Sequence, residues 1–178
     1  MRGKLVKTIV EPAIALEKSG VEGKILSFVA SWHRSVNAGK EIVDMAQFDF
    51  LLSNNKKPVQ VEVSYENGRF ETRVKDLSRE MGSVEEEEKL LDMIKLKTDT
   101  EIVEVLERDP RIENLMKRAK HLRLFSLSFL LFDEEFEAPV WKAVLKNWPL
   151  TNYFREEPVT VEAVIRGDGK LLQIRKII

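Results

Sequence analysis

Apolar and polar residues alternate through most of the chain, which predicts a protein built mainly of β-strands. Two neighbouring stretches, 25–36 and 42–52, alternate with a period of two, and residues 37–40 between them have the composition of a hairpin turn. A helical stripe is the alternative for the first stretch. We favour a strand, because the alternation resumes directly after the turn. Asp44 is the one residue that interrupts the apolar face of the second stretch.

Two further pairs of alternating segments are each joined at a glycine-containing turn. The first pair spans 58–75 around Asn67-Gly68, which is the strongest short hairpin signal in the chain. The second pair spans 158–177 around residues 167–169. Each pair begins with a proline, which a strand tolerates at its first residue. Both segments are therefore predicted to be β-hairpins.

Two sequence anchors occur twice, in the same order and at nearly the same spacing. A Leu-Ser-Phe triplet at 26–28 precedes Pro-Val-Gln-Val-Glu at 58–62, and a second triplet at 127–129 precedes Pro-Val-Thr-Val-Glu at 158–162. Chance is the alternative explanation, because such segments are common in strands. We interpret the chain as a tandem duplication of an antiparallel β-meander unit.

The expected fold class is α+β, with helices between and beside the two halves. The first α+β half covers residues 1–77, an acidic helical connector covers 78–97, and the second α+β half covers 98–178. We expect these parts to form one compact domain. The helices within 83–121 are predicted to pack between the halves or across one face.

Helix-capping residues mark the predicted helices. Pro12 suits the first turn of a short helix, which follows a predicted short strand over 4–10. Ser83 has a glutamate three residues later, which is the capping-box pattern, and Thr98 repeats it. Asp109, followed by proline, is expected to cap the helix that comes next.

The segments after these helices are predicted with different clarity. The last helix is expected to run from Pro110 to His121, and its last turn is rich in cations. Residues 122–132 are bulky on both faces and predict a central strand that is covered on both sides. Residues 139–148 fit either a helix opened by Pro139 or, if the duplication holds, a strand.

Composition narrows the class of protein. The 178 residues include no cysteine, charged residues make up 33% of the chain, and the net charge is −1. We therefore expect a cytoplasmic protein without disulfides, and the dense mixed charge suggests a heat-adapted source. No apolar run approaches the length of a membrane span, so no membrane association is expected. The balanced charge argues against bulk electrostatic binding of nucleic acid, although local patches remain open.

Catalytic motifs are missing from the sequence. There is no Walker loop, no GxGxxG and no GxSxG, and only two histidines, His33 and His121, are present. The sequence therefore nominates no catalytic residue, no cofactor and no metal ligand. Glu62 and Glu162 are the best candidates for a carboxylate pair, because they occupy corresponding positions in the two anchors. The alternative is that both are outward-facing strand residues.

Basic residues give the nearest approach to a functional site. In residues 102–122, the lengths and apolar spacing of two successive predicted helices resemble the first two helices of a helix-turn-helix, although the usual turn glycine and third helix are missing. The alternative is that the second helix has a structural role only, with its apolar side packed on the sheet and its basic side exposed to solvent. The candidate nucleic-acid contacts lie on the first hairpin and on this second helix: Lys56, Lys57, Arg69, Arg73, Arg111, Lys117, Arg118 and His121.

These observations favour a non-enzymatic binding or assembly module. Its expected partner is a protein or a second copy of the chain, and a groove between the two halves is the expected ligand site. A nucleic-acid-binding protein is the first alternative. An enzyme with a carboxylate site is the second alternative, and no motif supports it.

Overall fold

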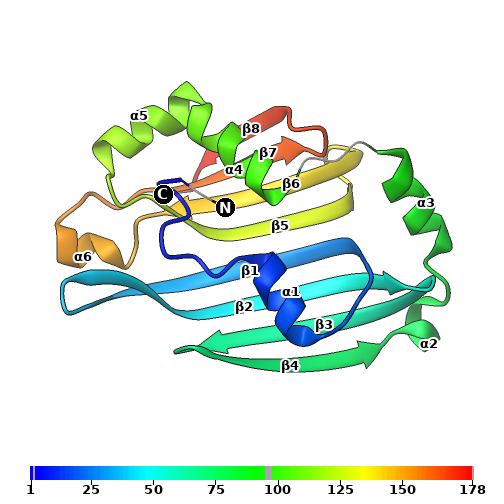
Figure 1. Ribbon diagram of the computed structural model, residues 1–178. Coiled ribbons are helices and arrows are strands. Elements are labelled where there is room, and N and C mark those ends of the chain that lie inside the picture. Colours follow the sequence, from blue (N-terminus) through cyan, green and yellow to red (C-terminus); the bar gives the residue numbers. More distant parts are fainter. Residues whose placement is uncertain (2, 95–97, 178) are drawn as a thin grey trace.

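The computed structural model describes residues 1, 3–94 and 98–177 of the chain, and its strands form one antiparallel sheet (Figure 1). The strands are β1 (Lys24–Asn37), β2 (Lys40–Asn54), β3 (Lys57–Glu66), β4 (Arg69–Asp76), β5 (Arg123–Asp133), β6 (Ala138–Lys146), β7 (Thr160–Arg166) and β8 (Leu171–Lys176). The helices are α1 (Pro12–Ser19), α2 (Ser78–Met81), α3 (Glu85–Met93), α4 (Asp99–Arg108), α5 (Pro110–Arg118) and α6 (Leu150–Phe154). The predicted α+β class is confirmed.

The eight strands lie in the order β4-β3-β2-β1-β5-β6-β7-β8. Each group of four consecutive strands is a meander, and the two meanders meet through their first strands. The strands predicted over 25–36 and 42–52 are confirmed as β1 and β2, and the undecided segment 139–148 is mainly strand β6. The sheet is continuous where the meanders meet, and a pocket of about 250 Å³ lies at this junction, lined mostly by the first half together with Leu130 of β5.

One row of paired residues crosses all eight strands, and every member of the row is apolar. From one edge of the sheet to the other it consists of Val74, Val61, Phe50, Phe28, Phe129, Trp141, Ile165 and Leu171. All but the two outermost members are buried. The alternation that predicted the strands thus supplies one apolar face, and this face is the core.

Three of the described helices, α1, α4 and α5, cover one face of the sheet (Figure 1), while Met81 of α2 lines a pocket on the other face. In Figure 1, α1 lies over the first meander, while α4 and α5 lie over the second. Ile102, Leu106 and Ile112 of these last two helices are fully buried in the core. The helices therefore pack across one face rather than between the halves. On the opposite face of β5, Ser126 and Ser128 are only half-buried, so the prediction that this strand is covered on both sides is wrong.

The helix caps agree only partly with the sequence pattern. Thr98 and Asp109 cap α4 and α5 as predicted, through bonds from the backbone N–H groups of Glu101 and Arg111. The N-cap of α3 is Val84 rather than Ser83, and it makes no side-chain capping bond. Residues 95–97 of the predicted connector lie outside the described residues. Among those described, no helix combines the length and apolar character needed to cross a bilayer.

The N-terminal segment is irregular, so the predicted strand over 4–10 is wrong. Leu5 is fully buried, and tertiary contacts fix its backbone. Its carbonyl accepts a hydrogen bond from the N–H of Leu124 at 2.7 Å, and its N–H donates to Oε1 of Glu107 at 3.0 Å. These contacts place the segment across the start of β5 and beside α4, where it forms one wall of the site described next.

Candidate anion-binding site

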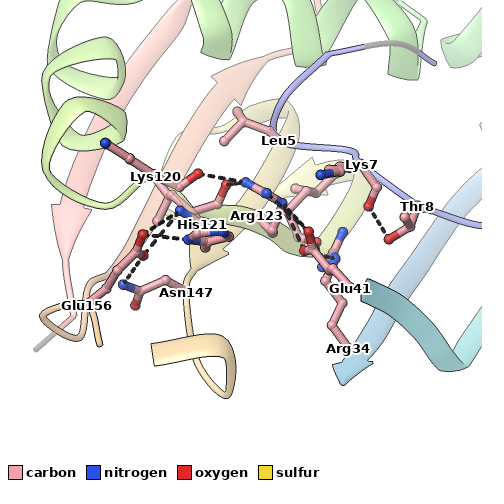
Figure 2. Close-up of polar contacts among 12 residues, drawn as sticks. Leu5, Lys7, Thr8, Arg34, Glu41, Lys120, His121, Arg123, Asn147 and Glu156 are labelled. Carbon is pink, nitrogen blue, oxygen red and sulfur yellow. Dashed lines mark hydrogen bonds and ion pairs between the residues drawn. The ribbon is translucent and has the colours of Figure 1, made fainter. Parts of the chain in front are cut away.

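Three charged side chains from distant parts of the chain meet in the interior. Arg34 follows Trp32 on the buried face of β1, Glu41 lies near the start of β2, and Arg123 opens β5. Their exposed fractions are 3%, 8% and 5%. Nε and Nη2 of Arg123 donate to the Glu41 carboxylate at 2.9 and 3.1 Å, and Nε of Arg34 lies 3.7 Å from Oε1 of Glu41 (Figure 2).

This cluster holds two guanidinium groups against one carboxylate. Burial lowers the pKa of Arg34 to about 10, although the Glu41 carboxylate opposes the shift, so the guanidinium stays charged at neutral pH. Its Nη1 donates to the carbonyl of Leu124 at 2.6 Å, but its Nη2 has no partner within the described part of the chain. The interior therefore carries an excess positive charge, which is costly unless an anion lies nearby.

A pocket of about 820 Å³ lies between the N-terminal segment, α5 and the start of β5. This volume is within the range of pockets that hold small-molecule ligands. The residues that line the pocket are Gly3, Lys4, Lys7, Glu107, Glu113, Met116, Lys117, Lys120 and Arg123. Two lysines come from each of two opposing segments, and the buried cluster reaches the pocket through Arg123.

The two acidic residues of the lining already have partners. Glu107 accepts the hydrogen bond from the N–H of Leu5, and Glu113 lies 3.8 Å from Nζ of Lys117. Gly3 makes the close approach to Glu107 possible. Its φ of 138° is strained for other residues, and a Cβ at this position would collide with the Glu107 carboxylate. Four lysines and one arginine therefore face two occupied carboxylates.

The guanidinium of Arg123 is largely engaged by the protein itself. Besides its bonds to Glu41, its Nη1 donates to the carbonyls of Lys120 and Leu122 at 3.1 and 3.0 Å. Arg123 thus contributes positive charge at the pocket, but most of its N–H donors are already used in hydrogen bonds within the protein. The exposed lysines supply the mobile donors that a bound anion needs.

A second polar cluster adjoins the pocket through Lys120. Nδ1 of the next residue, His121, lies 2.6 Å from Oε1 of Glu156, and the His121 ring stacks on Phe154 with centroids 3.6 Å apart. Burial raises the pKa of Glu156, but hydrogen bonds from His121 and Asn147 outweigh it, so the pKa is lowered overall. Figure 2 shows this cluster beside the buried arginines. It fastens the segment after β6 to the turn between α5 and β5.

The basic residues predicted on the first hairpin do not form one surface. Lys56 and Lys57 lie at the β2–β3 turn, while Arg69 lies at the other end of β3, about 30 Å away for a strand of this length. Lys56 pairs with Glu85 at 3.2 Å. Arg73 lies on the edge strand β4, opposite Glu62 of β3. The role of these residues as nucleic-acid contacts therefore stays a prediction, without a common surface to support it.

The basic residues predicted around α5 are only partly brought together. Arg111 folds back onto the capping carboxylate of Asp109 at 3.0 Å, and Arg118 is exposed outside the pocket. Lys117 lines the pocket. The helix ends at Arg118, so His121 is not on its exposed face as predicted but in the turn that follows. β5 follows α5 after a short turn, so a third helix does not come next in the chain, and the helix-turn-helix alternative stays a prediction.

Sequence reasoning missed most of the site. It did not select Lys4, Lys7, Lys120 or Arg123, because the contacts that gather them span long stretches of the chain. One signal was present for the buried cluster. Arg34 continues the alternation that places Trp32 on the apolar face, and a charged residue in such a position indicates a buried ion pair.

The predicted carboxylate pair is not formed. Glu62 and Glu162 lie on β3 and β7 with four strands between them, which corresponds to about 24 Å. Each has a local partner, since Glu62 accepts from Gln60 at 3.4 Å and Glu162 lies 3.3 Å from Arg175. The other histidine, His33, contacts Asp44 at 2.6 Å on the uncovered face of the sheet.

Comparison with protein-family models, with curated proteins and with solved structures finds no significant match for this chain. Functional conclusions therefore depend on the geometry of the site alone.

Proposed function

We propose that this protein is a non-enzymatic binding module that holds an anionic ligand in the basic pocket. The observation that carries the proposal is the excess positive charge of the Arg34–Glu41–Arg123 cluster, which lies directly behind the four lysines of the pocket. A bound anion would neutralise charge that the protein itself leaves uncompensated. The electrostatic gain is largest where the lining is partly buried, because solvent screens it less.

The same lining favours binding over catalysis. General acid–base chemistry needs a carboxylate or imidazole that can reach the ligand. Glu107 is occupied by the backbone of Leu5, Glu113 lies beside Lys117, and His121 is held by Glu156 and Phe154. What is left to contact a ligand is a set of exposed lysines, which suit a non-directional hold on phosphate or carboxylate groups.

We further propose that the scaffold arose by internal duplication. Two four-stranded meanders joined through their first strands are the arrangement that such an event would produce. The Leu-Ser-Phe anchors lie in corresponding strands, β1 and β5, while the proline-containing anchors lie in β3 and across the start of β7. The basic pocket is lined by the N-terminal segment of the first half as well as by α4, α5 and the start of β5. On this proposal both halves contribute to the ligand site, the first through Lys4 and Lys7 and the second through Lys117, Lys120 and Arg123.

Titration calorimetry with inorganic tripolyphosphate tests the ligand site. Binding should be measurable at low salt, and Lys7→Glu or Lys120→Glu should each weaken it about tenfold or more, equivalent to about 1.4 kcal/mol. Lys57→Glu is the matched control, because it makes the same charge change at the β2–β3 turn and should leave the affinity unchanged. Absence of binding, or equal weakening by all three variants, would refute the pocket as the site.

A further inference from the structure

Aromatic rings continue from the basic pocket onto the surface. Lys120 lines the pocket, and the ring of the next residue, His121, is parallel to Phe154 within 4°. Phe154 in turn contacts the ring of Tyr153 edge-on, with centroids 4.9 Å apart. Tyr153 is 56% exposed, so ring contacts lead from His121, the residue after Lys120, to a solvent-facing ring.

The exposed rings are held on a fixed support. Trp148, which is 53% exposed, belongs to the same segment between β6 and β7. Its neighbour Asn147 is fully buried, donates to the carbonyl of Glu157 at 2.8 Å and accepts from the N–H of Val159 at 2.9 Å. Both ends of the segment are thereby anchored, and the large side chains of Trp148 and Tyr153 are presented to solvent.

The two features suit different parts of one ligand. Figure 1 shows α6, which carries Tyr153, at the same end of the sheet as the last turn of α5. Proteins that bind single-stranded nucleic acid combine a positively charged groove for the phosphates with exposed aromatic rings on which bases stack. A small inorganic anion would contact the lysines but not the aromatic rings.

We propose that the anionic ligand is single-stranded nucleic acid, whose phosphates occupy the basic pocket and whose bases stack on Tyr153 and Trp148. This inference rests on the proposed function of the pocket. It depends on a local concentration of charge, because the chain as a whole has a net charge of −1. The first half contributes Lys4 and Lys7 to the pocket lining, while its strand residues Lys57, Arg69 and Arg73 do not line the pocket.

Fluorescence anisotropy with a labelled oligothymidylate of about ten nucleotides tests the inference, with tripolyphosphate as the parallel probe. Tyr153→Ala should weaken oligonucleotide binding about five- to 150-fold, the range expected for the loss of one stacked base, and leave tripolyphosphate binding unchanged. Tyr153→Phe should restore the affinity because it keeps the ring. Phe132→Ala is the control, since it removes a ring that is 58% exposed at the other end of β5.

The outcomes separate the two proposals. If tripolyphosphate binds through the lysines but Tyr153→Ala does not affect the oligonucleotide, the stacking inference is wrong and the anion site stands. If neither probe binds, both proposals fail. A duplex of equal length that binds as tightly as the single strand would also overturn the inference, because paired bases cannot stack on the rings. Melting temperatures of the variants confirm that each remains folded.

Discussion

Phe28 of β1 lies directly opposite Phe129 of β5, so the two meanders meet at a pair of identical side chains. Each phenylalanine ends one of the two Leu-Ser-Phe triplets. Both rings contact Trp141, at centroid distances of 5.6 and 5.0 Å. The junction of the sheet is therefore held by an aromatic cluster as well as by backbone hydrogen bonds.

Truncation at this junction should be among the most damaging changes to stability. Phe129→Ala removes a ring that is only 2% exposed and should lower the free energy of unfolding by about 3–5 kcal/mol. Phe132→Ala, three residues later on the same strand, removes an exposed ring and should change it by no more than about 0.5 kcal/mol. Urea denaturation followed by circular dichroism measures both. Similar losses in the two variants would contradict the packing described for the junction.

Glu41 should be indispensable to the buried charged cluster. Glu41→Ala leaves Arg34 and Arg123 facing each other in the interior without a carboxylate, and should cost about 3–5 kcal/mol of unfolding free energy. The exposed Glu113→Ala removes only a surface partner of Lys117 and should cost less than about 0.5 kcal/mol. Thermal and chemical denaturation of the two variants provide the comparison. An unchanged stability of Glu41→Ala would show that the cluster is not the source of the excess charge.

The β3–β4 turn should depend on the conformation of Gly68. Its φ is 87°, and no atom lies within 4 Å of the position a Cβ would take, so backbone strain alone sets the cost of a side chain there. Gly68→Val should destabilise the protein by about 1 kcal/mol or more, while Gly68→Asn, which tolerates this conformation better, should cost less. Differential scanning calorimetry gives the ranking, and equal melting temperatures would contradict it.

The Arg166–Asp168 pair should give an acid-range signal. A side-chain hydrogen bond from Arg166 lowers the pKa of Asp168 to about 2, from 3.8. Because the folded-state pKa is depressed, the pair stabilises the fold above about pH 4, and its contribution is lost as pH falls through about 2. Both side chains are partly exposed, so solvent screening keeps this contribution to stability small. An NMR titration should show this low midpoint, and Arg166→Ala should move it back toward 3.8.

The exposed arginines of α5 should be dispensable. Arg111 pairs with the capping residue Asp109, and Arg118 lies outside the pocket lining. Changing both to alanine should alter the free energy of unfolding by no more than about 0.5 kcal/mol and leave tripolyphosphate affinity intact. A flattened salt dependence of binding in this double variant would show instead that the helix contacts phosphates.

Local signals in the sequence predicted most of the elements. Asn67-Gly68 and the alternation on either side of it specify a hairpin, because the turn and the strands agree. Residues 139–148 were ambiguous because Val140, Trp141 and Val144 have helical spacing while the duplication predicts a strand, and pairing with β5 and β7 decides for a strand. The choice lies in contacts that a local pattern does not contain.

The candidate site was much less predictable. Leu5 resembles a strand residue, yet its conformation is set by Glu107 and Leu124, more than a hundred residues away. The same contacts bring Lys4 and Lys7 to the pocket. Periodicity predicts which residues share a face of an element. It does not predict which distant segment covers that face, and the lysines come together only through that long-range packing.

The buried cluster connects the β1–β2 hairpin to the second meander, because Arg34 and Glu41 come from β1 and β2 while Arg123 comes from β5. A chain cut in the connector would separate Arg123 from the carboxylate that neutralises it, and would expose the inner edges of β1 and β5. We expect the two fragments to be poorly folded alone and to reassemble when mixed. In this respect we expect the two fragments to depend on each other for folding as the subunits of an obligate heterodimer do.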